Sequence, residues 1–91
     1  MTRAEFETDL RGEGYEVREG EIEPHVHRDA HAHGFDARLL VLDGSITLVF
    51  SADRVTYGPG DFCRVPAGTM HEEHTEADGV RYVVGRRSAS A

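Results

Sequence analysis

The chain has 91 residues, which is room for one domain only, because domains run from about 50 to 250 residues. Its 17 acidic residues outnumber its 10 basic ones and give a net charge of −7. Since nucleic-acid affinity is built from Lys and Arg contacts to phosphate, this balance excludes nucleic acid as an expected partner. Cys63 is the single cysteine, so an intrachain disulfide is impossible and a reducing compartment is favoured.

The start of the chain lacks the apolar run of a signal peptide, and no stretch offers the roughly 18 apolar residues of a membrane span. We therefore expect a cytoplasmic protein with no membrane partner. A chain this short buries a modest fraction of its surface and needs a metal or a second subunit for stability. We predict a homodimer, because the expected barrel leaves open strand edges and the N-terminal helix has little core of its own to pack on.

A helix is expected first in chain order. Thr2 and Glu5 have the spacing of a capping box, and Phe6 and Leu10 lie four apart on one helical face. Glycines at positions 12 and 14 end this element. We assign residues 1–14 to the helix and its lead-in, residues 15–85 to a β-barrel and residues 86–91 to a flexible tail. The Arg86-Arg87 pair falls in that tail, and an anion clamp is its alternative interpretation.

From residue 15 onward apolar residues alternate with polar ones, which indicates short strands. We expect about seven strands, which include residues 15–22, with a break at Gly20, and then 39–42, 45–50, 54–57, 62–65 and 80–84. Asp43-Gly44 predicts a tight hairpin between the second and third of these, and Ser51–Asp53 predicts the next turn. Strands this short, with turns every 8 to 12 residues or so, are typical of an all-β sandwich or barrel.

Histidine is unusually frequent, with six in the chain. Four of them form two His-x-His pairs, His25 with His27 and His31 with His33. Residues two apart on a strand face the same side, so either pair can place two imidazoles together. Imidazole is a ligand for divalent transition metals, and a third ligand from a distant strand would close one face of the coordination sphere.

A second pattern supplies that third ligand. Gly60, Pro66, Gly68 and His71 fit Gly-x5-Pro-x-Gly-x2-His, and the composition of the chain makes a chance match a matter of about one in five hundred. With the His31-x-His33 pair and Gly44, this pattern resembles the two motifs of the cupin family. The resemblance covers about residues 17 to 85. In this chain Ala37 occupies the position of the family's first-motif glutamate, and Thr75 that of the asparagine four residues after the second-motif histidine.

The resemblance implies an all-β, double-stranded β-helix (jelly-roll) barrel that holds one divalent metal ion per chain: Fe, Zn, Mn, Ni or Cu. The implied metal ligands are His31, His33 and His71. Because Ala37 cannot bind metal, Glu73 and Asp36 are candidates for a fourth ligand or a catalytic base; Glu73 shares a strand face with His71, whereas Asp36 is one residue out of register.

Several other residues are expected to have structural or surface positions rather than a role in the chemistry. His25, His27 and His74 are expected to be solvated surface residues, although His27 stays open as a fourth ligand. Cys63 is expected to be a small core hydrophobe rather than a nucleophile. Phe35, Leu39, Val41 and Met70 are expected to form pocket walls.

For function, the three-histidine variant resembles thiol and diketone-cleaving dioxygenases, so we expect a small-molecule metalloenzyme, an oxidoreductase of the dioxygenase kind. Two alternatives stay open: a non-catalytic module that binds or senses a small molecule, and a metal-free structural barrel. The barrel fold hosts all three, so the fold does not choose among them.

Overall fold

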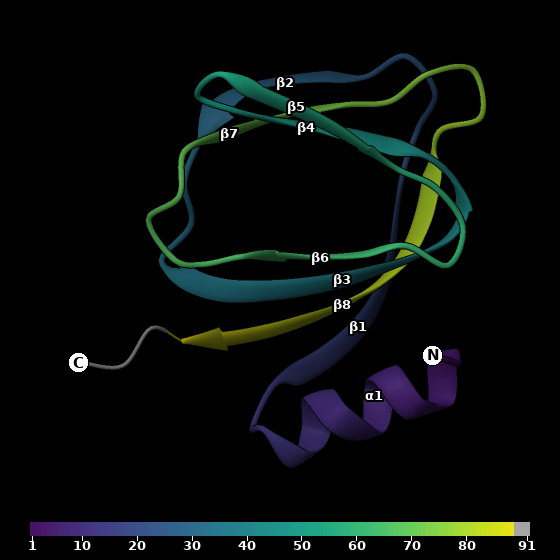
Figure 1. The fold of residues 1–91 in the computed structure, drawn as a ribbon, viewed down its shortest axis with the longest axis vertical. Helices are drawn as coiled ribbons and strands as arrows, with labels where there is room; N and C mark the ends of the chain where they lie inside the picture. Colours follow the sequence, from purple (N-terminus) through teal and green to yellow (C-terminus); the bar gives the residue numbers. More distant parts are fainter. Residues whose placement is uncertain (89–91) are drawn as a thin grey trace.

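The structure is a computed structural model and describes residues 1–88. Two four-stranded antiparallel sheets face each other, and a single helix covers the outside of one of them (Figure 1). Within the described residues, no helix combines the length and the apolar character that crossing a membrane requires. The elements in chain order are α1 (Arg3–Gly12), β1 (Glu16–Ile22), β2 (His27–His31), β3 (Phe35–Gly44), β4 (Ile46–Phe50), β5 (Asp53–Tyr57), β6 (Phe62–Val65), β7 (His71–His74) and β8 (Val80–Ser88).

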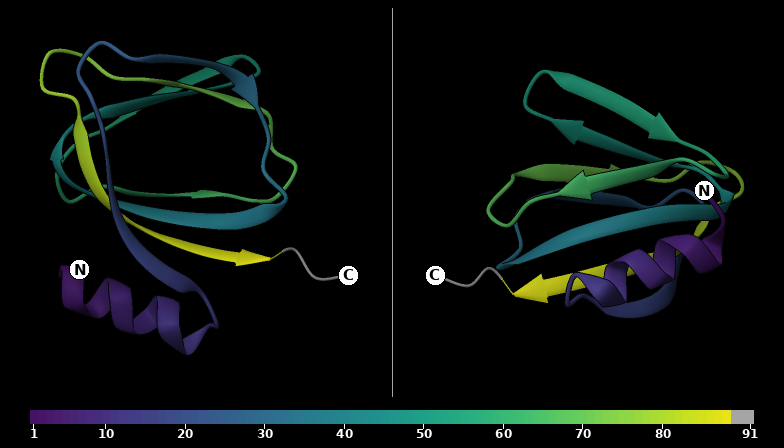
Figure 2. Two further views of the ribbon diagram at one scale, coloured as in Figure 1. Left: turned by 180° about the vertical axis from the view of Figure 1, so that it is seen from behind. Right: turned by 60° about the horizontal axis from the view of Figure 1, so that its bottom comes forward.

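The chain passes repeatedly between the two sheets. The first sheet has the order β1-β8-β3-β6 and the second the order β2-β7-β4-β5. Figure 2 shows the two layers from behind and from below, with α1 against the first sheet only. Apolar side chains of both inner faces form the core, among them Ile22, Val41 and Leu48. The predicted all-β jelly-roll with a short N-terminal helix is confirmed.

The predicted hairpin at Asp43-Gly44 is wrong. β3 and β4 lie in different sheets, so this dipeptide forms a corner at which the chain leaves the first sheet for the second. Gly44 has a φ of +74°, which a residue with a Cβ adopts only with strain. The Ser45 N–H donates to the Gly79 carbonyl oxygen over 2.9 Å, which fastens the corner to the loop before β8. The turn expected at Ser51–Asp53 does form, and it joins β4 and β5 as an antiparallel hairpin.

The helix α1 packs against its own chain. The Thr2–Glu5 capping box is present, and Phe6 and Leu10 are completely buried against the outer face of the first sheet. The helix lies close to the sheet at Gly85 of β8, where an added Cβ would lie only 2.7 Å from Leu10 Cδ2. The expectation that the helix has little core of its own is therefore wrong, and it no longer supports a dimer.

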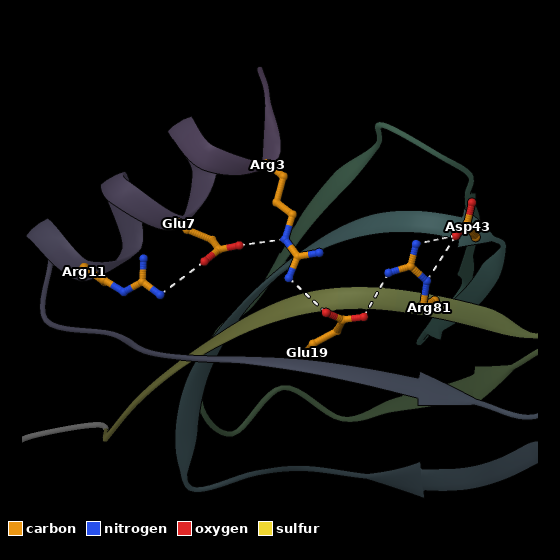
Figure 3. A network of polar contacts seen from close by, with 6 residues as sticks. All are labelled: Arg3, Glu7, Arg11, Glu19, Asp43 and Arg81. Atoms are coloured by element: carbon orange, nitrogen blue, oxygen red, sulfur yellow. Dashed lines mark hydrogen bonds and ion pairs between the residues drawn. The ribbon is translucent and has the colours of Figure 1, made fainter.

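A network of charged side chains fastens α1 to the first sheet (Figure 3). Arg3 is central to it: the guanidinium is 2.7 Å from Glu7 on the same helix and 2.9 Å from Glu19 on β1. Glu19 in turn pairs with Arg81 of β8 over 2.9 Å. These ion pairs are exposed, so their stabilisation is modest and weakens with salt.

The end of the chain differs from the expected flexible tail. β8 continues through Ser88 and pairs with β3 as far as Phe35, so Arg86 and Arg87 are strand residues. Hydrogen bonds to β3 hold these residues in an extended strand, although their sequence has no apolar periodicity that would have predicted one. The rest of the expected tail, residues 89–91, lies outside the described residues.

Candidate metal centre

The histidines of the two motifs reach one place because of a β-bulge in β2. β2 pairs with β7 so that His27 faces His74, Arg28 faces Glu73, and His31 faces His71. Three steps along β2 therefore match two steps along β7, which is one extra residue. With strict alternation, the side chains of residues 27 and 31 would lie on the same face of the sheet. The extra residue places them on opposite faces. His31 consequently joins the face of β7 that carries His71 and Glu73.

The loop before β7 brings the second motif to the first. The Thr69 N–H donates to the Pro66 carbonyl oxygen over 3.1 Å and closes a turn. Gly68, with a φ of +80°, donates its N–H to the His33 carbonyl oxygen over 3.0 Å. The proline and glycine of the second motif thus build a turn just before β7. Through Gly68, three residues before His71, this turn is hydrogen-bonded to the segment that carries His33.

The three predicted histidines and Glu73 converge. His31 Nε2 lies 2.9 Å and His71 Nε2 lies 3.3 Å from the same oxygen, Glu73 Oε2. One ligand atom from each of the four residues lies within 4.8 Å of all the others. His71 is buried, with 3% of its surface exposed, and the His33 ring is stacked on Phe35 with 4.6 Å between ring centroids. The donor set therefore has three imidazoles and one carboxylate.

Backbone carbonyls set the tautomers of two of these imidazoles. His31 Nδ1 lies 2.7 Å from the Asp29 carbonyl oxygen, and His71 Nδ1 lies 2.9 Å from that of Thr69. Because a carbonyl only accepts, Nδ1 carries a proton in each ring, and in the neutral ring it is Nε2 that presents a lone pair. Two lone pairs then face a carboxylate oxygen at close range, an arrangement that needs a proton or a cation between them. The donor set fits a divalent metal ion, and the carbonyl contacts are those that orient metal-binding histidines.

The surroundings of His33 favour the neutral form of its imidazole ring. Burial lowers the pKa of His33 below its ordinary value, and the neighbouring imidazoles of His31 and His71 lower it further. A lowered pKa keeps the ring neutral, and a neutral imidazole is the form that binds a metal.

A cavity of about 110 Å³ lies beside this cluster, between the two sheets. Its walls are mostly apolar and include Phe35 and Leu39. Its polar lining consists of Arg28, His33, His71, Glu73, Tyr82 and Arg86. The volume is below the 300–1,000 Å³ or so that is typical of pockets for drug-sized ligands, so the space suits a small molecule.

A family model described as "Cupin domain" matches residues 13–84, most of the chain. This chain belongs to the cupin domain family. Among curated proteins, quercetin 2,3-dioxygenase from Bacillus subtilis is 36% identical to this cupin over 59 residues, which are 65% of this chain. The chain spans only 16% of the length of that relative.

Solved structures agree on the fold. A protein of unknown function from Rhizobium leguminosarum superposes with a TM-score of 0.76 at 19% identity, covering 81% of this chain and 70% of the other. A cupin-2 domain protein from Shewanella frigidimarina gives 0.67 at 19% identity, with 80% and 71% covered. A DMSP lyase from Ruegeria pomeroyi gives 0.71 at 19% identity, with 82% and 40% covered.

The structure separates the two carboxylate candidates. Glu73 lies in the cluster, whereas Asp36 lies outside it: Asp36 Oδ1 accepts a hydrogen bond from the Ala67 N–H over 2.9 Å, and Oδ2 is 3.7 Å from Arg87. Ala37, at the position of the motif glutamate, lines the cavity. In this cupin the carboxylate next to the histidines therefore comes from β7 rather than from β3.

Other sequence expectations for the site need correction. Met70 is exposed, with 56% of its surface accessible, and Val41 is in the core, so neither is a wall of the cavity. Thr75, at the motif's asparagine position, is buried and structural: its hydroxyl accepts the Val26 N–H over 3.0 Å and donates to the Glu23 carbonyl oxygen. It holds the segment that leads into β2.

Sequence reasoning missed two groups of residues. Arg28 and Arg86 line the cavity, but their inward orientation depends on the bulge in β2 and on the unexpected length of β8. His27 and His74 do not stand alone as solvated residues, because both contact Glu72 on the outside of the second sheet. The alternation of β7 already places Glu72 beside His74; only the strand register reveals His27.

Proposed function

We propose that this cupin binds one divalent metal ion through His31, His33 and His71, with Glu73 as the fourth ligand, and that it oxidises a small anionic molecule with dioxygen. The convergence of two imidazole Nε2 atoms on one carboxylate oxygen carries the proposal. When bound, a divalent metal supplies a Lewis acid and a template for the small molecule and its oxidant. Because a dioxygenase transfers both oxygen atoms to its product, the reaction needs no external reductant.

The residues around the cavity support an anionic substrate. Arg28 Nη1 lies 3.4 Å from Glu73 Oε1, so its charge is partly balanced within the site. Arg86 lines the same cavity with its guanidinium carbon 4.9 Å from the centroid of the Phe35 ring. Arginine binds carboxylates through paired N–H donors, so Arg86 is placed to orient an acid at the cavity while apolar walls exclude water from the rest of it.

Glu73 has a second role in this proposal. Its two carboxylate oxygens face different partners, with Oε1 toward Arg28 and Oε2 toward the histidines. A carboxylate placed at the edge of the cavity can take the acidic proton of a thiol or a 1,3-diketone as that molecule binds. The similarity to quercetin 2,3-dioxygenase supports an oxygenase, and the small cavity supports a substrate smaller than a drug-sized molecule.

The first part of the test counts metal ions by elemental analysis after exchange. His71→Ala should remove one ion per chain, and His25→Ala, an exposed histidine outside the cluster, should not. Glu73→Gln should weaken binding, and adding Ala37→Glu should return a carboxylate to the cavity and recover part of the affinity. Occupancy should fall as the pH drops below about 6, where imidazoles become protonated.

The second part measures oxygen uptake. The Fe²⁺-loaded protein should consume dioxygen only when a thiol acid or a 1,3-diketone is added, and His33→Ala should abolish the uptake. Arg86→Gln should raise KM for an acidic substrate more than it lowers kcat. Tight metal-dependent binding of such a compound without uptake would instead support a binding module, and a barrel with neither metal nor ligand would overturn the proposal.

A further inference from the structure

A second histidine cluster lies on the outer face of the second sheet. His27 of β2 and His74 of β7 are directly opposite in the strand register, and Glu72 lies two residues before His74. Because the side chains of β7 alternate, Glu72 and His74 point away from the face that carries His71 and Glu73. The cluster is therefore separate from the candidate metal centre, although the same two strands carry both.

The three outer residues already have nearly the spacing of a coordination sphere. His27 Nε2 lies 3.1 Å and His74 Nε2 lies 3.0 Å from one oxygen, Glu72 Oε1. The centroids of the two imidazole rings are 4.1 Å apart, and all three ligand atoms lie within 4.8 Å of one another. A tetrahedral Zn²⁺ ion with bonds of about 2.0–2.1 Å places its donors about 3.3 Å apart. Small side-chain rotations would bring these donors to that separation.

Access and charge also suit a cation. α1 covers the first sheet, and the outer face of the second sheet is not covered by it (Figures 1 and 2). The side chains of His27 and Glu72 are 55% and 35% exposed, so an ion can reach them from solvent. The fully exposed Asp29 carboxylate lies 3.5 Å from His27 Nε2 and can serve as a further oxygen ligand.

We propose that His27, Glu72 and His74 form a second site for a divalent transition metal, of which Zn²⁺ is the probe of choice. Two imidazoles and a carboxylate are a donor set that zinc uses in proteins. The ligands come from two hydrogen-bonded strands that are 45 residues apart in sequence, so a bound ion would cross-link β2 to β7. An ion that binds only the folded state raises stability by mass action, and it would do so on the strands that carry His31 and His71.

Titration with Zn²⁺, followed by calorimetry and elemental analysis, tests this site. The wild type and His25→Ala should each bind two ions per chain, and His27→Ala/His74→Ala should bind one ion fewer. Zn²⁺ should raise the thermal unfolding midpoint of a His71→Ala variant, which keeps only the outer site, and should not do so once His74 is also replaced. If His71→Ala fails to fold, His33→Ala takes its place.

Two results would overturn the outer site. One is a His27→Ala/His74→Ala variant that binds as many ions as the wild type does. The other is a Zn²⁺-induced rise in stability that survives in the variant lacking both His71 and His74. Failure of the barrel centre alone is distinguishable, because His71→Ala would then bind as many ions as the wild type while His27→Ala/His74→Ala would still lose one.

Discussion

Single residues decide the chemistry of the cavity. Ala37 removes a carboxylate from β3, and Glu73 provides one from β7, so the cluster keeps three imidazoles and one acidic group. An acidic group would lower the net charge at a bound divalent ion, so the proposed preference for an anionic substrate rests less on the metal than three neutral ligands alone would imply. Arg86 offsets this loss, because its guanidinium adds positive charge at the cavity wall, whereas the charge of Arg28 is partly balanced by Glu73.

Cys63 also lines this cavity, but its environment makes it unreactive. Burial, with a smaller contribution from the charge of Glu73, raises the pKa of the Cys63 thiol to about 11. The thiolate is the reactive form, and a raised pKa means that the thiol stays protonated through neutral and mildly basic pH. We expect iodoacetamide to alkylate native Cys63 far more slowly than the urea-unfolded chain at pH 8. Equal rates in the two states would contradict this assignment.

At the scale of elements, α1 is an integral layer of the molecule. Its side chains Phe6 and Leu10 form a second apolar cluster, between the helix and the outer face of the first sheet, together with Tyr15, Leu40 and Val83. The first sheet is therefore apolar on both faces, which explains why β3 contains the run Leu39–Leu42 instead of a strict alternation of apolar and polar residues. Removal of the helix would expose that second face to water.

This packing predicts the cost of one substitution. Phe6→Ala should lower the free energy of unfolding by about 3–5 kcal/mol, the usual range for a buried phenylalanine. Met70→Ala is the control: that residue is also a large hydrophobic with 56% of its surface exposed, so its loss should change the stability by no more than about 0.5 kcal/mol. Urea unfolding followed by circular dichroism measures both values. Similar effects of the two substitutions would show that α1 is not docked as described.

At the scale of the whole molecule, the two sheets formed by residues 1–88 have four edge strands, β1 and β6 in the first sheet and β2 and β5 in the second. The edges β5 and β6 carry exposed apolar side chains, Val55 and Phe62. An unpaired edge with apolar residues is a ready surface for a second chain. The homodimer prediction rests on these edges, because the apolar face of α1 is already buried within its own chain.

Light scattering decides the oligomeric state. We expect a particle of about twice the 10.1 kDa mass of the chain at micromolar concentration, and we expect Phe62→Arg to shift it toward the monomer because a charge at the interface is costly to desolvate. Val55→Ser should have a weaker effect in the same direction. A wild-type monomer under these conditions would rule the dimer out.

The sequence by itself determined the features that depend on near neighbours. The capping box set the start of α1, the turn residues of the second motif set the approach to His71, and the spacing of the two motifs singled out His31, His33 and His71, which the fold brings together. Alternation along one strand also sufficed to place Glu73 with His71. Each of these follows from geometry over a few residues.

Only the tertiary structure decided the features that depend on how distant strands pair. The corner at Gly44 contains a dipeptide that also suits a hairpin, and the choice between them lies in the partners of β3 and β4. The extra residue in β2 reverses side-chain parity, which brings His31 inward and leaves His27 outside beside His74. Arg86 faces the cavity because β8 continues along β3. Strand register is set by contacts over the whole sheet, and a one-residue shift moves every side chain to the other face.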